Sequence, residues 1–95
     1  MKAELVTRFR NVSDAGTGIE MVVWRVPAPV PPSRHCYKYR LVYLVEGQRA
    51  IGFDNERGKG DHMHRGDQQS PYEFVGVDQL IDDFIREVEA CQGEH

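Results

Sequence analysis

The strongest constraint on the fold is a pair of β-rich runs within residues 35–57, HCYKYRLVYLVEGQRAIGFDNER. Tyrosine and β-branched residues favour strands, and the Glu46-Gly47-Gln48 stretch between the two runs is typical of a hairpin turn. With Gly47 and Gln48 as the two turn residues, Glu46 faces Arg49. This register is favoured because it pairs opposite charges beside the turn and apolar side chains further along.

The predicted register decides which side chains share a face of the hairpin. In it Val42 faces Phe53, and the same face continues away from the turn as Lys38, Arg40, Asn55 and Arg57. The opposite face carries Tyr37, Tyr39, Leu41 and Tyr43 against Gly52, Asp54 and Glu56. We therefore expect the open end of the hairpin to be polar on both sides, with basic groups on one side and tyrosines with carboxylates on the other.

The remaining chain predicts an α+β fold in one domain, residues 1–95. Residues 19–26 read as a central strand, residues 2–10 as a first strand or short helix, and residues 72–74 as a short edge strand. Four prolines make residues 26–33 a stiff connector. Residues 77–91 have apolar side chains at helical spacing. We expect an antiparallel β-sheet of four or five strands, with this C-terminal amphipathic helix packed on one face.

Charge and cysteine content narrow the class of protein. The net charge of −3 argues against a general nucleic-acid coat protein, although it leaves room for a local basic patch. No apolar stretch has the length of a membrane span or the pattern of a secretory signal, so we expect a cytoplasmic protein that does not enter a membrane. In that compartment Cys36 and Cys91, which form no CxxC motif, are expected to be buried free thiols.

Residues 54–67, DNERGKGDHMHRGD, combine many charged residues with glycine and histidine, and we expect them to form a loop that carries the functional site. Lys59, between two glycines, is placed to contact a phosphate, although the spacing of a nucleotide-binding P-loop is missing. His62 and His64 are two residues apart, so in an extended segment their imidazoles point to the same side. They could act as a general acid and base, or they could be structural side chains in a hydrogen-bonded loop.

Metal binding is an alternative use of the same histidines. Two imidazoles on one side can hold zinc when a carboxylate completes the set, and Asp61 is the nearest candidate in sequence. Asp54, at the end of the preceding run, could orient a histidine, bind the metal, or only satisfy the backbone of a turn. We expect no cofactor to be required, with a divalent metal at His62, His64 and Asp61 as the alternative.

The sequence also resembles a known family. The string YRLVYLVEGQRAIGFDNERGKGDHMH, followed by YEF and LIDDF, is similar to the TumE family of small toxins from toxin–antitoxin modules. The pattern that carries the resemblance falls on Phe53, Asp54, Asn55, Gly58, Lys59, Gly60, Asp61, His62 and His64. The resemblance implies a toxin whose partner is a helix-turn-helix antitoxin.

Three hypotheses follow. In the first, the chain is an RNA-cleaving toxin with His62, His64, Asp54 and Lys59 as catalytic residues. Its RNA is then bound by Arg40, Lys38, Arg57, Asn55 and Tyr39. In the second, the chain is a non-enzymatic regulatory or interaction protein, and the charged stretch and the acidic helix surface are docking sites. In the third, it is a metal-binding module.

Overall fold

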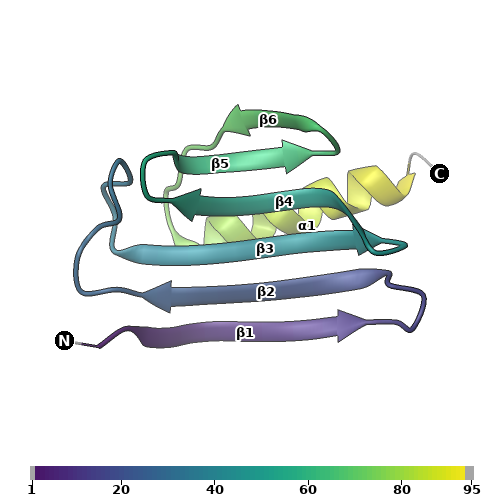
Figure 1. Cartoon of the computed structure of the whole chain (residues 1–95), viewed down its shortest axis with the longest axis horizontal. Coiled ribbons are helices and arrows are strands. Elements are labelled where there is room, and N and C mark those ends of the chain that lie inside the picture. The colour runs from purple at the N-terminus through teal and green to yellow at the C-terminus, as the bar shows by residue number, and fades with distance from the viewer. Residues whose placement is uncertain (1, 94–95) are drawn as a thin grey trace.

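The computed structural model describes residues 2–93 and contains one six-stranded antiparallel sheet with a helix on one face (Figure 1). The strands pair in the order of the sequence, so each is hydrogen-bonded to its neighbours along the chain. Their bounds are β1 Glu4–Val12, β2 Gly18–Arg25, β3 Tyr37–Val45, β4 Gln48–Glu56, β5 Gly60–Arg65 and β6 Gln68–Pro71, and the helix is α1, Val77–Gly93. The α+β class is confirmed, but the sheet has six strands rather than four or five.

The β3–β4 hairpin is confirmed, whereas its predicted register is wrong: the turn is displaced by one residue, and the pairing from Tyr43 onward is offset by one residue. The turn residues are Glu46 and Gly47, both with positive φ (52° and 80°), instead of Gly47 and Gln48. The turn is held from outside the hairpin, because Thr17 Oγ1 accepts the Glu46 N–H (3.1 Å) and the Gly16 carbonyl accepts the Gly47 N–H (2.9 Å). These two bonds satisfy the backbone of a turn that places a non-glycine residue in the left-handed region.

A one-residue slip moves a strand's side chains to the other face relative to its partner. Leu41 therefore pairs with Phe53, and Arg40 pairs with Asp54, instead of the predicted pairing of Val42 with Phe53. The change of turn alone would move each pairing by two residues and keep the faces. The exchange of faces comes from the irregularity between Tyr43 and Leu44, where Ala50 is left out of the ladder. As a result Asp54 shares a face with Arg40, and Asn55 lies on the other face.

The two strands that sequence patterns missed are β5 and β6. The sequence predicts a loop over residues 54–67, which contain β5, because Gly and Asp have low strand propensity. It predicts no element over residues 68–71, which form β6. Residues 72–74, predicted as an edge strand, lie beyond β6 and cross to the helix side. There Tyr72 and Phe74 pack against the core, and the Tyr72 hydroxyl donates to Asp83 (2.6 Å). At the other end of the sheet, residues 2–10 form most of the strand β1 rather than a helix.

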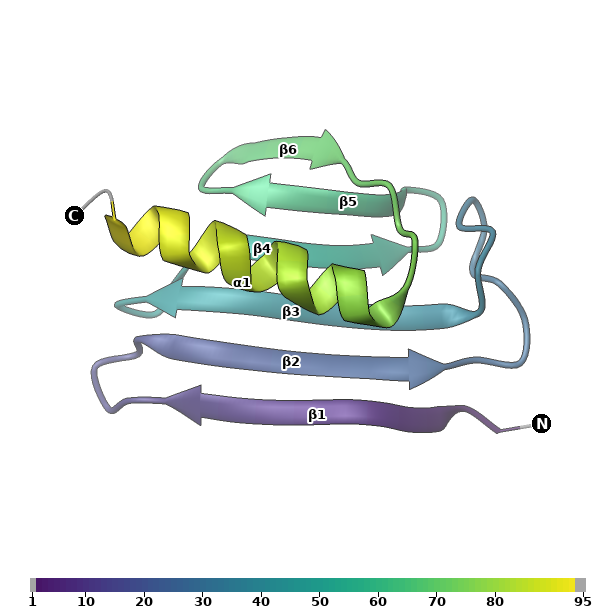
Figure 2. The same ribbon diagram turned by 180° about the vertical axis from the view of Figure 1, so that it is seen from behind.

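The core lies between α1 and the middle of the sheet (Figure 2). Leu80, Phe84 and Val88 form the buried stripe of α1, and the ring of Phe84 meets Phe53 edge-on with centroids 6.0 Å apart. The predicted helix over 77–91 is confirmed and extends to Gly93. Figure 2 shows α1 over β3 and β4, so within residues 2–93 no helix covers β1 or β2.

The proline-rich connector turns back over the end of the sheet. The Pro31 carbonyl accepts the Gly58 N–H (2.9 Å), which ties the connector to the β4–β5 turn. The Pro31–Pro32 peptide bond is cis. Cys36 and Cys91 are both free thiols, but they are partly buried rather than fully buried. Within residues 2–93, no helix is both long enough and apolar enough to span a membrane.

Candidate functional site

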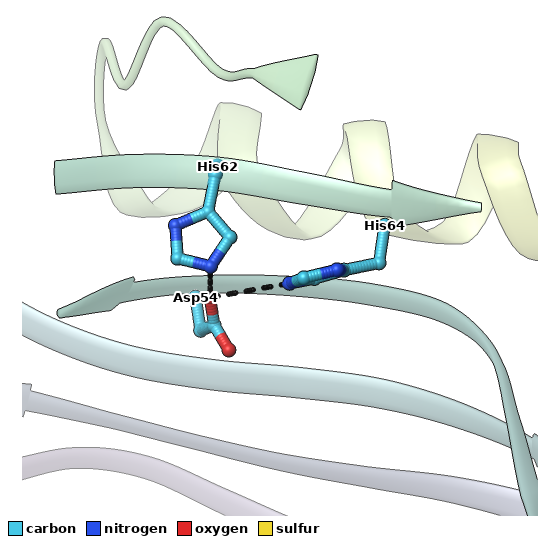
Figure 3. Close-up of side chains that lie close together, drawn as sticks. All are labelled: Asp54, His62 and His64. Carbon is cyan, nitrogen blue, oxygen red and sulfur yellow. Dashed lines mark ion pairs between the residues drawn. The ribbon is translucent and has the colours of Figure 1, made fainter. Parts of the chain in front are cut away.

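Asp54, His62 and His64 form a compact buried group on the face of the sheet away from α1. Strand β5 alternates, so His62 and His64 point to one side while Asp61 and Met63 point to the other. Asp54 is the direct partner of His62 across the β4–β5 ladder. Figure 3 shows both imidazoles reaching toward the Asp54 carboxylate: His62 Nε2 is 2.5 Å and His64 Nε2 is 3.8 Å from Oδ1.

The tautomer of His62 follows from its second contact. Its Nδ1 lies 3.0 Å from the carbonyl oxygen of Gly60. A carbonyl can only accept, so Nδ1 carries a proton and donates. In a neutral ring, Nε2 then directs a lone pair at the carboxylate 2.5 Å away, which is repulsive. Either a second proton on His62 or a cation between the two atoms removes this repulsion.

His64 is held in the opposite tautomer. A guanidinium can only donate, so the Arg49 Nη2 that lies 3.1 Å from His64 Nδ1 leaves that nitrogen unprotonated. The proton of the neutral ring is therefore on Nε2, which faces Asp54. Burial lowers the pKa of His64, and the positive charge of Arg49 lowers it further, against the opposing effect of Asp54. His64 is thus a neutral imidazole at pH 7, with its basic nitrogen turned toward Arg49.

Arg49 reaches His64 because residue 52 is glycine. A Cβ on Gly52 would lie 2.8 Å from Cδ of Arg49, so the arginine side chain runs over the position where another residue would project. Gly52 is the ladder partner of His64, which places it directly beneath this contact. The Arg49 side chain therefore packs directly on the backbone of β4 at Gly52.

The same three side chains have the donor atoms of a metal site. One ligand atom from each of Asp54, His62 and His64 lies within 4.8 Å of the others. His62 has the outer contact typical of a metal-bound histidine, namely Nδ1–H donated to a backbone carbonyl. His64 does not, because Arg49 occupies its Nδ1. The ligand atoms of tetrahedral zinc are about 3.3 Å apart. His62 Nε2 and Asp54 Oδ1, which are 2.5 Å apart, would therefore have to separate to bind it.

Asp61, expected as the third metal ligand, is not the carboxylate beside His62 and His64. It lies on the side of the sheet that faces α1, where its oxygens accept hydrogen bonds from Ser33 (2.5 Å) and Tyr39 (2.7 Å). His35 Nε2 lies 2.6 Å from the same carboxylate, and the His35 ring stacks on Phe74 with centroids 3.8 Å apart. This second cluster joins the connector to β5.

Two of the residues expected to bind substrate are buried in the same region. Tyr39 is only 1% exposed, so its ring does not present a surface on which a base could stack. Asn55 is fully buried, and its side chain accepts from the Tyr39 N–H (3.0 Å) and donates to the Tyr37 carbonyl (2.7 Å). These partners are backbone groups beyond the last β3–β4 ladder pair, so the Asn55 amide continues the pairing of β3 with β4.

The four basic residues expected at the site differ in how they are placed relative to the Asp54–His62–His64 group. Arg40 is the ladder partner of Asp54 on the same face, and Lys38 donates to the backbone carbonyl of Asn55. Lys59 pairs with Glu56 at 3.9 Å and shares with His62 the lining of a hollow of about 200 Å³. Arg57 is exposed in the β4–β5 turn.

Arg49 is the site residue that the sequence analysis missed. The predicted register paired it with Glu46, which concealed its position beside His64. Its true ladder partner is Leu44.

Comparison with known proteins gives one match. The sequence model of the family described as Toxin TumE matches residues 2–92, nearly the whole chain. No curated protein sequence and no solved structure matches the chain.

Proposed function

The chain belongs to the TumE toxin family, and on this premise we propose that it acts by cleaving RNA at the site formed by Asp54, His62 and His64. The observation that carries the proposal is the position of His64 between Asp54 and Arg49. A neutral imidazole whose N–H faces a carboxylate, here at 3.8 Å, can act as a general base once that contact tightens on a substrate, and a guanidinium beside its basic nitrogen can contact a phosphate.

In the proposed reaction, His64 Nδ1 takes the proton of a ribose 2′-hydroxyl. The 2′-oxygen then forms a bond to the adjacent phosphorus, and the bond from phosphorus to the 5′-oxygen breaks. His62, when protonated on both ring nitrogens, gives one proton to the leaving 5′-oxygen. The products are a cyclic phosphate and a free 5′-hydroxyl. Arg49 would bind the phosphate that reacts, and Arg40, Lys59, Arg57 and Lys38 would bind its neighbours.

The test is cleavage of RNA by the purified protein with a chelator present. We expect cyclic-phosphate ends, and we expect loss of activity in His64→Gln and Asp54→Asn. His35→Gln is the matched control, because His35 also contacts a carboxylate but lies outside this group. No cleavage by the folded native protein, alone or with divalent metals, would refute the proposal and favour the non-enzymatic interaction protein.

Family membership also suggests an antitoxin partner. We propose that this partner is a helix-turn-helix protein and that the toxin acts in the cytoplasm, where RNA is available. Induction of the chain in a bacterium should arrest growth, the His62→Ala/His64→Ala variant at equal level should not, and co-expression of the helix-turn-helix partner should restore growth. Arrest by the variant would show that toxicity does not depend on these histidines.

A second candidate function is binding of a divalent metal by Asp54, His62 and His64. The observation that favours it is the outer hydrogen bond of His62 to Gly60, which leaves Nε2 free for a ligand bond. Titration with zinc should then shift the imidazole NMR signals of His62 and His64 and leave those of His35 unchanged. Unchanged signals at stoichiometric zinc would exclude this candidate, while RNA cleavage that requires added metal would favour it over metal-free catalysis.

A further inference from the structure

Basic side chains are concentrated on the face of the sheet that has no helix, although the net charge of the whole chain is negative. We call this face the open face. Its cations are Arg8, Arg10, Lys38, Arg40 and Arg49, against the carboxylates Glu20, Asp54 and Glu56. The acidic residues of α1, among them Asp83 and Glu87, lie on the other side of the sheet. The net charge of −3 therefore divides into a basic open face and an acidic helix side.

The strand register connects the basic residues of the open face with the Asp54–His62–His64 group, which lies on the same face. One row of direct ladder partners crosses five strands: Arg8, Val22, Arg40, Asp54 and His62. Four strand spacings separate β1 from β5, which is about 19 Å. Arg8 is thus at the far end of a straight row that ends at the proposed site.

A hollow lies at the β1 end of this row. Arg8, Arg10 and Arg40 are among its lining residues, and its volume is about 320 Å³. Glu20 is the acidic group in it, 3.5 Å from Arg10 and 4.0 Å from Arg40. Three guanidinium groups against one carboxylate leave an excess of positive charge, which suits a phosphate.

An aromatic side chain lies beside the hollow. Trp24 is two residues along β2 from Val22, so it points to the same open face, and it is only partly buried. Its ladder partners are Leu5 and Lys38. A basic surface with an aromatic ring on a sheet face is the combination that binds single strands, where unstacked bases lie on the ring and the cations follow the backbone.

We propose that this surface, formed by Arg8, Arg10, Arg40 and Trp24, binds the single-stranded part of the substrate RNA next to the cleaved bond. A single strand is favoured over a duplex because Trp24 can stack only on a base that is not already stacked and paired. The inference rests on the proposed function for the identity of the ligand. Its test therefore uses binding instead of cleavage.

The experiment measures binding of a 2′-O-methyl oligonucleotide of about ten nucleotides, which the proposed reaction cannot cleave. Trp24 is the single tryptophan of the chain, so stacking on it should quench the intrinsic fluorescence of the protein directly. Arg8→Gln/Arg10→Gln should weaken binding on the order of tenfold and reduce the slope of log K against log salt by about 1.4, from two lost phosphate contacts.

The matched control is Arg25→Gln/Arg86→Gln, which removes the same charge from other surfaces. Arg25 pairs with Tyr37 on the side of the sheet that faces α1, and Arg86 belongs to α1 itself. Equal effects of the two double variants would overturn the proposal, because binding would then depend on total charge alone. Circular dichroism verifies that both variants are folded.

Two other outcomes would also overturn it. Preference for duplex RNA over a single strand would exclude the stacking role of Trp24. If Arg8→Gln/Arg10→Gln reduced affinity for the antitoxin and left RNA affinity unchanged, the surface would be a protein interface. Failure of the proposed RNA cleavage can be distinguished from failure of the proposed RNA binding. A protein that binds RNA at this surface but cleaves none would still show the fluorescence quenching and the salt dependence.

Discussion

Asn55 provides the sharpest test of the structural assignment, because the sequence suggested a substrate contact and the structure gives it a different set of partners. Asn55→Ala removes an acceptor from the Tyr39 N–H and a donor from the Tyr37 carbonyl, both in a buried region. Each unsatisfied buried group costs about 1–3 kcal/mol. Water entering the end of the sheet can satisfy part of this loss, so we expect destabilisation of about 3 kcal/mol.

The destabilisation expected for Asn55→Ala is large compared with the free energy of unfolding of the whole chain. A chain of this length is stable by about 5–14 kcal/mol, so the variant would lose a substantial fraction of its free energy of unfolding. Urea unfolding followed by circular dichroism and Trp24 fluorescence measures it. Asn11→Ala is the matched control, since Asn11 is exposed on β1 and should change stability by less than about 0.5 kcal/mol. An Asn55→Ala variant as stable as the native chain, but defective in RNA binding, would refute the structural role.

Three further predictions concern other parts of the molecule. Arg49→Ala frees His64 Nδ1, so zinc affinity measured by calorimetry should rise while RNA cleavage falls; cleavage at the native rate would remove Arg49 from the site. Burial raises the pKa of Asp61, but hydrogen bonds from Ser33, Tyr39 and His35 outweigh it and hold the pKa below its ordinary value. The stability from ionised Asp61 is therefore present above about pH 4 and lost as the pH falls through the lowered pKa, so acid unfolding of Asp61→Asn should lack this component. Phe84→Ala should cost about 3–5 kcal/mol in urea unfolding, and a loss below about 1 kcal/mol would contradict the assigned core.

Patterns of residue type correctly predicted the elements with strong periodicity. The apolar stripe of α1 and the β-rich runs of the β3–β4 hairpin depend on local rules that operate within a few residues. The side-by-side arrangement of His62 and His64 follows from the same kind of rule, because alternation in a strand requires only that the segment is extended.

The register of the hairpin could not be obtained in this way. The positive φ of Glu46 is supported by Thr17, 29 residues earlier, and no local pattern announces a hydrogen bond over that separation. The irregularity between Tyr43 and Leu44, which no local pattern predicts either, shifts the pairing beyond it by one residue and exchanges the faces. For that reason the predicted register placed Asp54 and Asn55 on the wrong sides relative to Arg40 and Tyr39.

The choice between Asp61 and Asp54 as the carboxylate beside the histidines was, by contrast, within reach of the sequence. Asp61 is adjacent to His62, and adjacent residues of a strand point to opposite faces. Treating the charged stretch as a loop removed that argument. Once the stretch is recognised as β5, alternation excludes Asp61 and directs attention to the neighbouring strand.

The order of elements along the chain has a consequence for biosynthesis. Each strand pairs with the one made just before it, so the sheet can assemble progressively during translation. Its inner surface, including Leu41 and Phe53, stays uncovered until α1 has emerged from the ribosome. A toxin built in this order reaches its packed form only after every strand has been synthesised, which leaves an interval in which nascent chains carry the site residues without the support of the finished core.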